Sequence, residues 1–173
     1  MPAVIFFSLP LFLILNNMVR FKHRWILFQV NQDPVIENGQ IVYPRTSLRL
    51  NDQMISRAIY NQIEIYYGQF GKGLGSVAVK WYNPDTRIGI MRIPRDYTNM
   101  YLSTMFYMNK VASVPCSISI LRVSGTIIFV QTAAIEWDRT YYIREQEEAE
   151  KKGQHYSSAE KIEASKKQIT SIS

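Results

Sequence analysis

The sequence VPCSISILRVSGTIIFVQTAAIEWDR, residues 114–139, decides the fold of this chain. Its first half alternates with the period of two that is typical of a half-buried strand, with Ser117, Ser119, Leu121 and Val123 on one face and Ile118, Ile120, Arg122 and Ser124 on the other. Gly125 interrupts this run, and glycine can turn sharply without steric cost. Thr126 then occupies the position of a helix N-cap, and apolar residues follow at helical spacing: Ile127, Val130, Ala134 and Trp137. The stretch predicts a strand, a Gly-Thr hinge and a long helix.

The composition favours one basic domain with extensions at its ends. The chain has 173 residues, is 47% hydrophobic and carries a net charge of +6, which suits a polyanionic partner such as nucleic acid or a membrane surface. The positive charge lies in residues 1–144, whereas residues 145–173 are slightly acidic. The single cysteine, Cys116, excludes an intramolecular disulfide and fits a reducing compartment. The sequence has no cluster of His and Cys that would predict a zinc site.

The chain begins with an apolar run, Ala3–Leu15, that contains Ser8 and Pro10. The run is shorter than the roughly 20 residues of a spanning helix and lacks the features of a signal peptide. Because Met18 opens a basic composition at once, we expect residues 1–17 to be an extension ahead of the natural start. A poor signal or membrane segment is the alternative.

Four basic residues precede the first expected strand, Trp25–Val30: Arg20, Lys22, His23 and Arg24. They are either a solvated N-terminal arm or an arm that contacts phosphates, because Arg and Lys on a flexible lead-in can follow a nucleic-acid backbone. Residues 31–46 contain Pro34, Gly39 and Pro44 and are expected to be a loop.

The middle of the chain supplies the remaining core elements. Residues 51–67 have apolar side chains at helical spacing, with Asn51 as N-cap and Gly68 as the stop. The glycines at 68–75 do not match a phosphate-binding loop, so we expect a mobile loop that brings Lys72 towards RNA. Residues 77–82 and 88–93 read as a hairpin around a turn at 83–86, and residues 97–108 as a second helix.

This order of elements predicts an α+β, ferredoxin-like fold, with a four-stranded antiparallel sheet, two helices on one face and a C-terminal helix. RNA-recognition modules share this topology, but the strands lack the aromatic pattern that stacks bases, so the open sheet face is expected to meet a protein or a helical RNA. The expected divisions are residues 1–17, a domain at 18–144, and a charged helical extension at 145–173 that becomes disordered after Gly153.

Catalytic residues are not apparent. A nuclease that uses acid-base chemistry needs close carboxylates or a poised histidine. The folded region offers only scattered acids with structural roles available to them, including Asp85 in a turn and Glu136 and Asp138 near the surface end of a helix. The sequence therefore predicts a binding protein.

Several motifs in order resemble one protein family: Met18–Trp25, Ala78–Trp81 with Asn83 and Thr86, Val114–Cys116, Leu121–Ile127, Gln131 and Trp137–Arg139. Together they are similar to the Pop-five subunit family of ribonuclease P and RNase MRP, over roughly Met18 to Tyr142. The resemblance implies a subunit of the ribonucleoprotein that removes the 5′ leader of precursor tRNA, and of its relative that cleaves precursor rRNA.

The resemblance also implies cofactors, partners and location. The catalyst is RNA with Mg²⁺ on that RNA, and no cofactor is expected in the protein itself. The expected partners are ribonuclease P RNA, MRP RNA, precursor tRNA and a TIM-barrel-like subunit of the Rpp-thirty (Rpp-one) type, in the nucleus and nucleolus, with no stable membrane association. The expected RNA contacts are Arg20, Lys22, His23 and Arg24, and, as a second group, Lys72, Lys80, Arg92 and Arg122. Gly125 and Thr126 form the structural motif.

Two other functions stay open from the sequence. The chain could be a general RNA-binding module of ferredoxin-like shape, or an interaction domain tethered to a membrane by Ala3–Leu15. The copurifying RNA distinguishes the first from a ribonuclease P subunit, and membrane fractionation tests the second.

Overall fold

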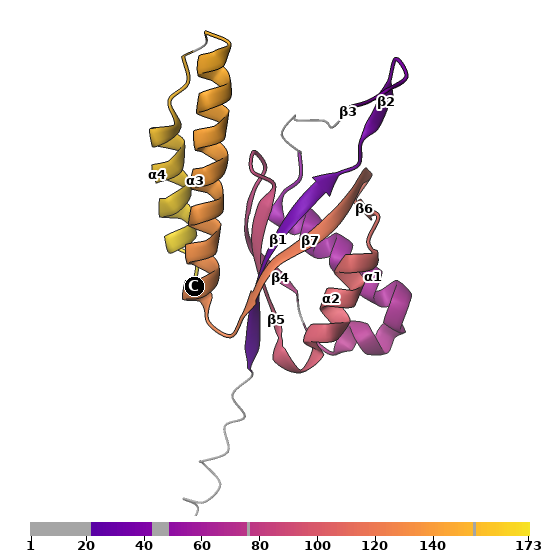
Figure 1. Ribbon diagram of the computed structural model, residues 1–173. Coiled ribbons are helices and arrows are strands. Elements are labelled where there is room, and N and C mark those ends of the chain that lie inside the picture. The colour runs from indigo at the N-terminus through magenta and orange to yellow at the C-terminus, as the bar shows by residue number, and fades with distance from the viewer. Residues whose placement is uncertain (1–21, 43–48, 76, 154) are drawn as a thin grey trace, which may run out of the picture.

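The computed structural model describes residues 22–42, 49–75, 77–153 and 155–173. Within these residues, one antiparallel sheet has the strand order β4-β5-β1-β7-β6 (Figure 1). Its strands are β1 (His23–Gln32), β4 (Ala78–Asn83), β5 (Ile88–Pro94), β6 (Lys110–Val111) and β7 (Val114–Ser124). A separate hairpin pairs β2 (Val35–Glu37) with β3 (Gln40–Val42). The helices are α1 (Asp52–Gly73), α2 (Thr98–Tyr107), α3 (Ile127–Lys151) and α4 (Ser158–Thr170), and a short 3₁₀ turn, η2 (Arg95–Tyr97), leads into α2.

The topology confirms the ferredoxin-like prediction. Apart from the short β6, the sheet elements and helices follow in the order β1, α1, β4, β5, α2 and β7, and β1 lies between β5 and β7. This is the split β-α-β arrangement, in which the first strand is central. β7 pairs with β1 over most of its length, from Trp25 opposite Ser124 to Gln32 opposite Cys116.

A β-bulge in β7 reverses the expected alternation of faces beyond Ile120. Leu27 lies opposite Arg122 and Phe28 lies opposite Ile120, so Leu121 is an extra residue on β7. Because residues directly opposite each other share a face, Arg122 lies on the face of Leu27 and not on that of Ile120. The sequence predicted the reverse, since a strict period of two does not allow for the extra residue.

The helices α1 and α2 cover one face of the sheet, as expected. Apolar side chains of both layers form this core: Ile26, Phe28, Val30, Met91, Ile93 and Ile118 from the strands, and Ile55, Ile59, Ile63, Tyr101 and Met105 from the helices. Asn51 caps α1, because its Oδ1 accepts a hydrogen bond of 2.8 Å from the backbone N–H of Met54. The predicted cap and the predicted apolar face of α1 are both confirmed.

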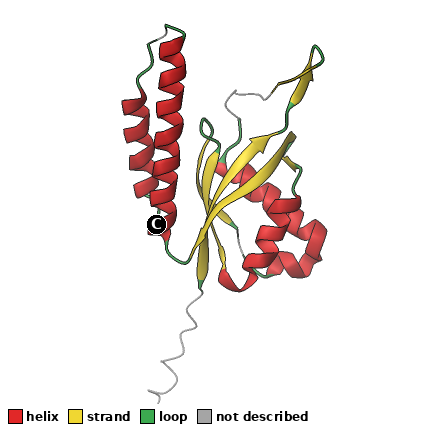
Figure 2. Ribbon diagram, viewed as in Figure 1, coloured by secondary structure: helices red, strands yellow, loops and turns green. Residues whose placement is uncertain are grey.

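The helices α3 and α4 cover the second face of the sheet. The sequence predicted the helix α3, but neither α4 nor the covering of this face. Figure 2 shows the sheet between two layers of helices. Ile88, Ile90, Leu27 and Trp81 of the sheet form a second apolar cluster with Val130 and Ala134 of α3 and Ile169 of α4. The expected open sheet face is therefore reduced to the part that these helices leave uncovered.

Three local expectations are wrong. Residues 35–42 form a hairpin where a loop was predicted, because Asn38 and Gly39 adopt the positive φ values, 51° and 76°, of a tight two-residue turn. Residues 158–170 form α4 where disorder was predicted, because Ile169 is fully buried and the indole Nε1–H of Trp81 donates to Gln168 Oε1 at 3.1 Å. Gly68, with φ 64° and ψ −164°, interrupts α1 as expected, but the helix resumes and ends at Gly73, so the glycine-rich segment is partly helical.

Among the residues that the structure describes, no helix is both long enough and apolar enough to cross a membrane. The apolar run Ala3–Leu15 lies outside those residues. The expected division at residue 17 and the membrane-tethered alternative therefore stay predictions.

Candidate nucleic-acid interface

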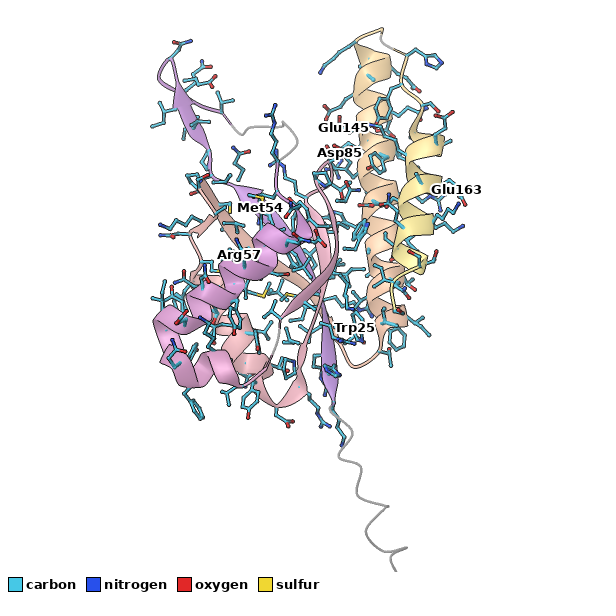
Figure 3. All side chains as sticks on the ribbon, turned by 180° about the vertical axis from the view of Figure 1, so that it is seen from behind. Trp25, Met54, Arg57, Asp85, Glu145 and Glu163 are labelled. Carbon is cyan, nitrogen blue, oxygen red and sulfur yellow. The ribbon has the colours of Figure 1, made fainter. Side chains whose placement is uncertain are left out.

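Basic residues gather at one end of the sheet, where β1 begins and β5 and β7 end. We call this group the basic end: Lys22, His23, Arg24, Arg92, Arg95 and Arg122. Strand register brings them together, because His23 lies opposite Pro94 and Trp25 lies opposite both Arg92 and Ser124. α3 starts beside this end, and Figure 3 shows Trp25 there. Residues far apart in the sequence thus meet at one end of the sheet. Arg92 and Arg122 lie there on the face of Trp25 and Leu27, whereas Arg24, opposite Ile93, lies on the other face.

Two arginines of the basic end lie over aromatic rings. Arg92 Cζ is 6.0 Å from the centroid of Trp25, and Arg122 Cζ is 5.8 Å from the centroid of Phe129. A guanidinium held over a ring face keeps its N–H donors directed outwards from its edge. Phe129 is also 58% exposed. Cations combined with an exposed ring can bind phosphates and stack a base, which is the chemistry of single-stranded nucleic-acid recognition.

Gly125 makes room for Arg24. A Cβ atom at Gly125 would lie 3.3 Å from Arg24 Nη1, which is tighter than most contacts of this kind. The same Nη1 lies 3.4 Å from its acceptor, the backbone carbonyl oxygen of His23. The sequence predicted glycine here for a sharp turn, but Gly125 is not among the described glycines with positive φ. Its role in the structure is close approach to a guanidinium.

Thr126 is the N-cap residue of α3, as predicted, with extended backbone angles φ −123° and ψ 145°. Its side chain makes no capping hydrogen bond. Instead, the backbone N–H of Thr126 donates to Ser124 Oγ at 3.1 Å. The hinge therefore directs the N-terminus of α3, the positive end of its helix dipole, beside the basic end.

Arg95 is a member of the basic end that the sequence analysis missed. Its backbone N–H donates to the carbonyl oxygen of Lys22 at 2.9 Å, which fixes Arg95 next to the basic N-terminal segment. The sequence signal that could have identified Arg95 is its position directly after β5, the strand that pairs with β1. Arg20 lies outside the described residues, and its role stays a prediction.

The basic end is free of acidic partners within the described part of the chain, since none of its six residues forms an ion pair there. Lys22, Arg95 and Arg122 are exposed, and the other three are partly exposed. Cations without carboxylate partners are available to neutralise the phosphates of a polyanion.

The structure separates Lys72 and Lys80 from this group. Lys72 lies on α1, and its Nζ is 2.6 Å from Glu64 Oε2. The hydrogen bond to Glu64 raises the pKa of Lys72. Lys80 is exposed on β4, the edge strand of the sheet, where the register with β5 shifts. Lys72 is thus the weaker candidate of the second predicted group, because an RNA phosphate would have to compete with Glu64.

A second polar cluster is buried between α3, α4 and the β4–β5 turn. We call it the Asp138 cluster: Asn83, Thr86, Asp138, Tyr142 and Ser165. Asn83 Nδ2 donates to Asp138 Oδ2 at 3.2 Å and to the Tyr142 hydroxyl at 3.1 Å, and the Ser165 hydroxyl also donates to Asp138 Oδ2. Asp138 is only 2% exposed. The sequence placed it near the surface end of a helix, which is wrong, because α4 covers it.

The electrostatics of this cluster follow from burial. Burial raises the pKa of Asp138, and the hydrogen bonds from Ser165, Thr86 and Asn83 lower it. Thr86 Oγ1 and Asp138 Oδ1 nonetheless lack a hydrogen bond of ordinary geometry among the described residues. Burial also raises the pKa of Tyr142, to about 12.

The Asp138 cluster serves structure. A substrate cannot reach a carboxylate that is so fully covered, and in the described ranges no group of three or more His, Cys, Asp or Glu side chains could hold a metal ion. Its hydrogen bonds instead join α3 and α4 to the turn between β4 and β5. Other polar contacts of α4 serve the same purpose, as when Gln131 Nε2 donates to the Ile169 carbonyl oxygen at 2.8 Å.

Comparison with known proteins identifies the family. The model of the Rpp14/Pop5 family matches residues 24–135, more than half of the chain, from the start of β1 into α3. The chain belongs to the Rpp14/Pop5 family. Four members of the basic end lie inside the family's matched range, namely Arg24, Arg92, Arg95 and Arg122, whereas Asp138 and α4 lie beyond it.

Curated relatives carry the name ribonuclease P/MRP protein subunit POP5. The chain is 30% identical to the Homo sapiens protein over 128 residues, which cover 70% of this chain and 73% of that protein. It is 29% identical to the Schizosaccharomyces pombe protein over 125 residues, which cover 71% of this chain and 90% of that protein. A chain in the cryo-EM structure of yeast ribonuclease MRP is also similar, with a TM-score of 0.48 at 13% identity, over 77% of this chain and 96% of that one.

Proposed function

We propose that this chain is a protein subunit of ribonuclease P and RNase MRP that binds and stabilises their catalytic RNA. Its family membership supports this assignment, because its relatives are named as subunits of these ribonucleoproteins. The observation that carries the proposal is the basic end, where cations without acidic partners among the described residues lie beside aromatic rings. This combination provides phosphate contacts and a stacking surface for RNA.

In this proposal the chain contributes no active site of its own. The Asp138 cluster, an enclosed group of polar side chains, is inaccessible to substrate. RNA with bound Mg²⁺ performs the cleavage, and the protein holds that RNA in its active form. The substrates are precursor tRNA, from which the 5′ leader is removed, and precursor rRNA in RNase MRP. The proposal includes the nucleus and nucleolus as the location of the chain, where these precursors are expected to be processed.

A protein subunit of the TIM-barrel-like Rpp-thirty (Rpp-one) type is the proposed neighbour in the particle. An aromatic patch on α1 and α2 is suited to such a partner: Tyr66, Tyr67, Phe70, Phe106 and Tyr107, of which Phe70 and Phe106 are 77% and 73% exposed. The Tyr66 hydroxyl donates to the Tyr107 carbonyl oxygen at 3.3 Å and so joins the two helices within the patch. Contiguous exposed apolar surface of this kind marks interaction sites.

The test is to tag the chain, purify it from its own cells and assay the eluate for Mg²⁺-dependent 5′ cleavage of precursor tRNA. We expect cleavage that disappears when the bound RNA is digested and that accompanies one long structured RNA. Mixed RNAs without cleavage would instead indicate a general RNA-binding module. Recovery in the membrane fraction that depends on residues 1–17 would indicate a tethered interaction domain.

A further inference from the structure

The hairpin β2–β3, here called the arm, extends beyond the end of β1 and away from the sheet (Figure 1). Its strands pair only with each other in the described part of the chain, with Val35 opposite Val42 and Ile36 opposite Ile41. All six strand residues are exposed. A two-stranded hairpin is at best marginally stable by itself in water, so an uncovered arm is unexpected unless another surface covers it.

Each face of the arm carries an apolar pair. Residues directly opposite each other share a face, and consecutive residues alternate between faces. Val35 and Val42, which are 47% and 37% exposed, therefore lie on one face, together with the polar pair Glu37 and Gln40 nearer the tip. Ile36 and Ile41, which are 77% and 66% exposed, form the other. A strand that lies on one partner surface needs only one apolar face, whereas two apolar faces call for contacts from both sides.

The charge of the arm favours a protein over RNA. Residues 31–42 include the acids Asp33 and Glu37 and no Lys or Arg. RNA phosphates would repel this segment and find no cation in it. A protein cleft with apolar walls would cover both faces, and its polar rim could pair with Glu37 near the tip. The arm also lies at the opposite end of β1 from the basic end.

We propose that the arm inserts between apolar surfaces of a protein subunit, with Val35 and Val42 against one wall and Ile36 and Ile41 against the other. This inference rests on the proposed function only in requiring an assembled particle. It adds a protein-binding element that is separate from both the basic end and the aromatic patch.

The first test removes one apolar face at a time from the full-length, tagged chain. Ile36→Ser with Ile41→Ser, and separately Val35→Ser with Val42→Ser, should each lower the recovery of the same protein about tenfold or more, as expected for the loss of a buried anchor. Ile128→Ser is the matched control, because Ile128 is 68% exposed but lies on α3. Unchanged recovery of every copurifying protein in either double variant would overturn the proposal.

The second test needs no destabilising variant. A photoreactive amino acid is placed at Ile36 and, in a separate chain, at Val42, and the native particle is irradiated before mass spectrometry. We expect both positions to crosslink to one and the same protein. Crosslinks to RNA, crosslinks from one face alone, or none from either would each contradict insertion between two walls.

The same eluate distinguishes failure of this inference from failure of the proposed function. Precursor tRNA cleavage without crosslinks from the arm would reject the arm and leave the function standing. Crosslinks to a protein in an eluate that neither contains a structured RNA nor cleaves precursor tRNA would reject the function and leave the arm standing.

Discussion

The two ends of β1 differ in nearly every property that decides what they bind. At His23 the strand enters a surface of cations, two of which lie over aromatic rings. At Gln32, roughly 30 Å away for ten extended residues, the chain continues into an acidic segment and the arm, which carries an apolar pair on each face. One central strand thus separates a surface suited to polyanions from a surface suited to protein. The difference teaches how one small subunit could divide its contacts: in our proposal, RNA binds at the first end and a protein subunit at the second.

Removal of the basic end should have the largest effect. Every phosphate contact that a substitution abolishes lowers the slope of log affinity against log salt by about 0.7 to 0.9. The variant Lys22→Ala, Arg24→Ala, Arg92→Ala, Arg122→Ala should therefore bind the copurifying RNA about 10²–10³-fold more weakly near 0.15 M salt. Filter binding over a salt series measures both quantities.

Surface lysines outside the basic end provide the control for that variant. Lys110→Ala, Lys151→Ala, Lys152→Ala and Lys167→Ala remove the same number of charges from β6, the end of α3 and α4, and should change the slope less. An equal change in slope for both sets would show that net charge alone, and not the basic end, attracts RNA.

A variant away from both ends tests whether they depend on a common scaffold. Asp138→Ala leaves buried donors of Asn83 and Ser165 without their acceptor and should lower the free energy of unfolding by about 1–3 kcal/mol. Urea denaturation measures the change. We expect the folded variant to bind RNA and to recover the arm's partner as well as the unchanged chain does. A decrease in RNA affinity alone would show that the Asp138 cluster is coupled to the basic end, and a decrease in partner recovery alone would show that it is coupled to the arm.

Gly125→Ala tests the basic end at a finer scale. The added Cβ would press on the Arg24 guanidinium at 3.3 Å, but a flexible side chain can move away, so the effect on stability should be small. Displacement of Arg24 should weaken RNA binding by about two- to fivefold, part of one charged contact. Gly73→Ala is the control, because nothing lies within 4 Å of a Cβ there. Equal affinities of the two variants would remove Arg24 from the RNA contacts.

The smallest expected effect is a pH dependence at the Asp138 cluster. The pKa of Asp138 is raised above its ordinary 3.8 by burial, so the folded state takes up a proton at a higher pH than the unfolded state. Protonation of Asp138 therefore stabilises the fold as pH falls from 7 towards 4, and this stabilisation disappears as pH rises through the raised pKa. Relative to Asp138→Asn, the unchanged chain should gain stability over that range. A constant difference between the two in urea denaturation would contradict the burial of this carboxyl group.

The sequence predicted the parts of the fold that depend on local pattern. Regular spacing of Ile55, Ile59 and Ile63 was sufficient to identify α1 and its buried face. The arm was missed although Asn38-Gly39 between apolar residues is a strong hairpin signal, because Pro34, Gly39 and Pro44 were read together as a loop. No local signal could reveal the burial of Asp138, since its partner Asn83 is 55 positions away and its cover, α4, looks like a charged tail.

The sequence predicted only part of the basic end, because contacts between distant residues leave no local signal. Arg24, Arg92 and Arg122 were named from the sequence, but strand register alone decides that they lie at the same end of the sheet as Arg95. Lys72 was named with them, and its contact with Glu64 could not be seen without the turn that Gly68 introduces in α1. Charge type is readable from sequence, whereas the pairing of charges depends on the folded chain.

One experiment would separate the two ends in a single sample: hydroxyl-radical footprinting of the purified native particle before and after nuclease digestion of its RNA. We expect His23 of the basic end and the exposed ring of Phe129 to become more reactive when the RNA is removed. The arm side chains Ile36 and Ile41 should stay protected. Exposure of the arm together with the basic end, or protection of both after digestion, would contradict the assignment of RNA to one end of β1 and protein to the other.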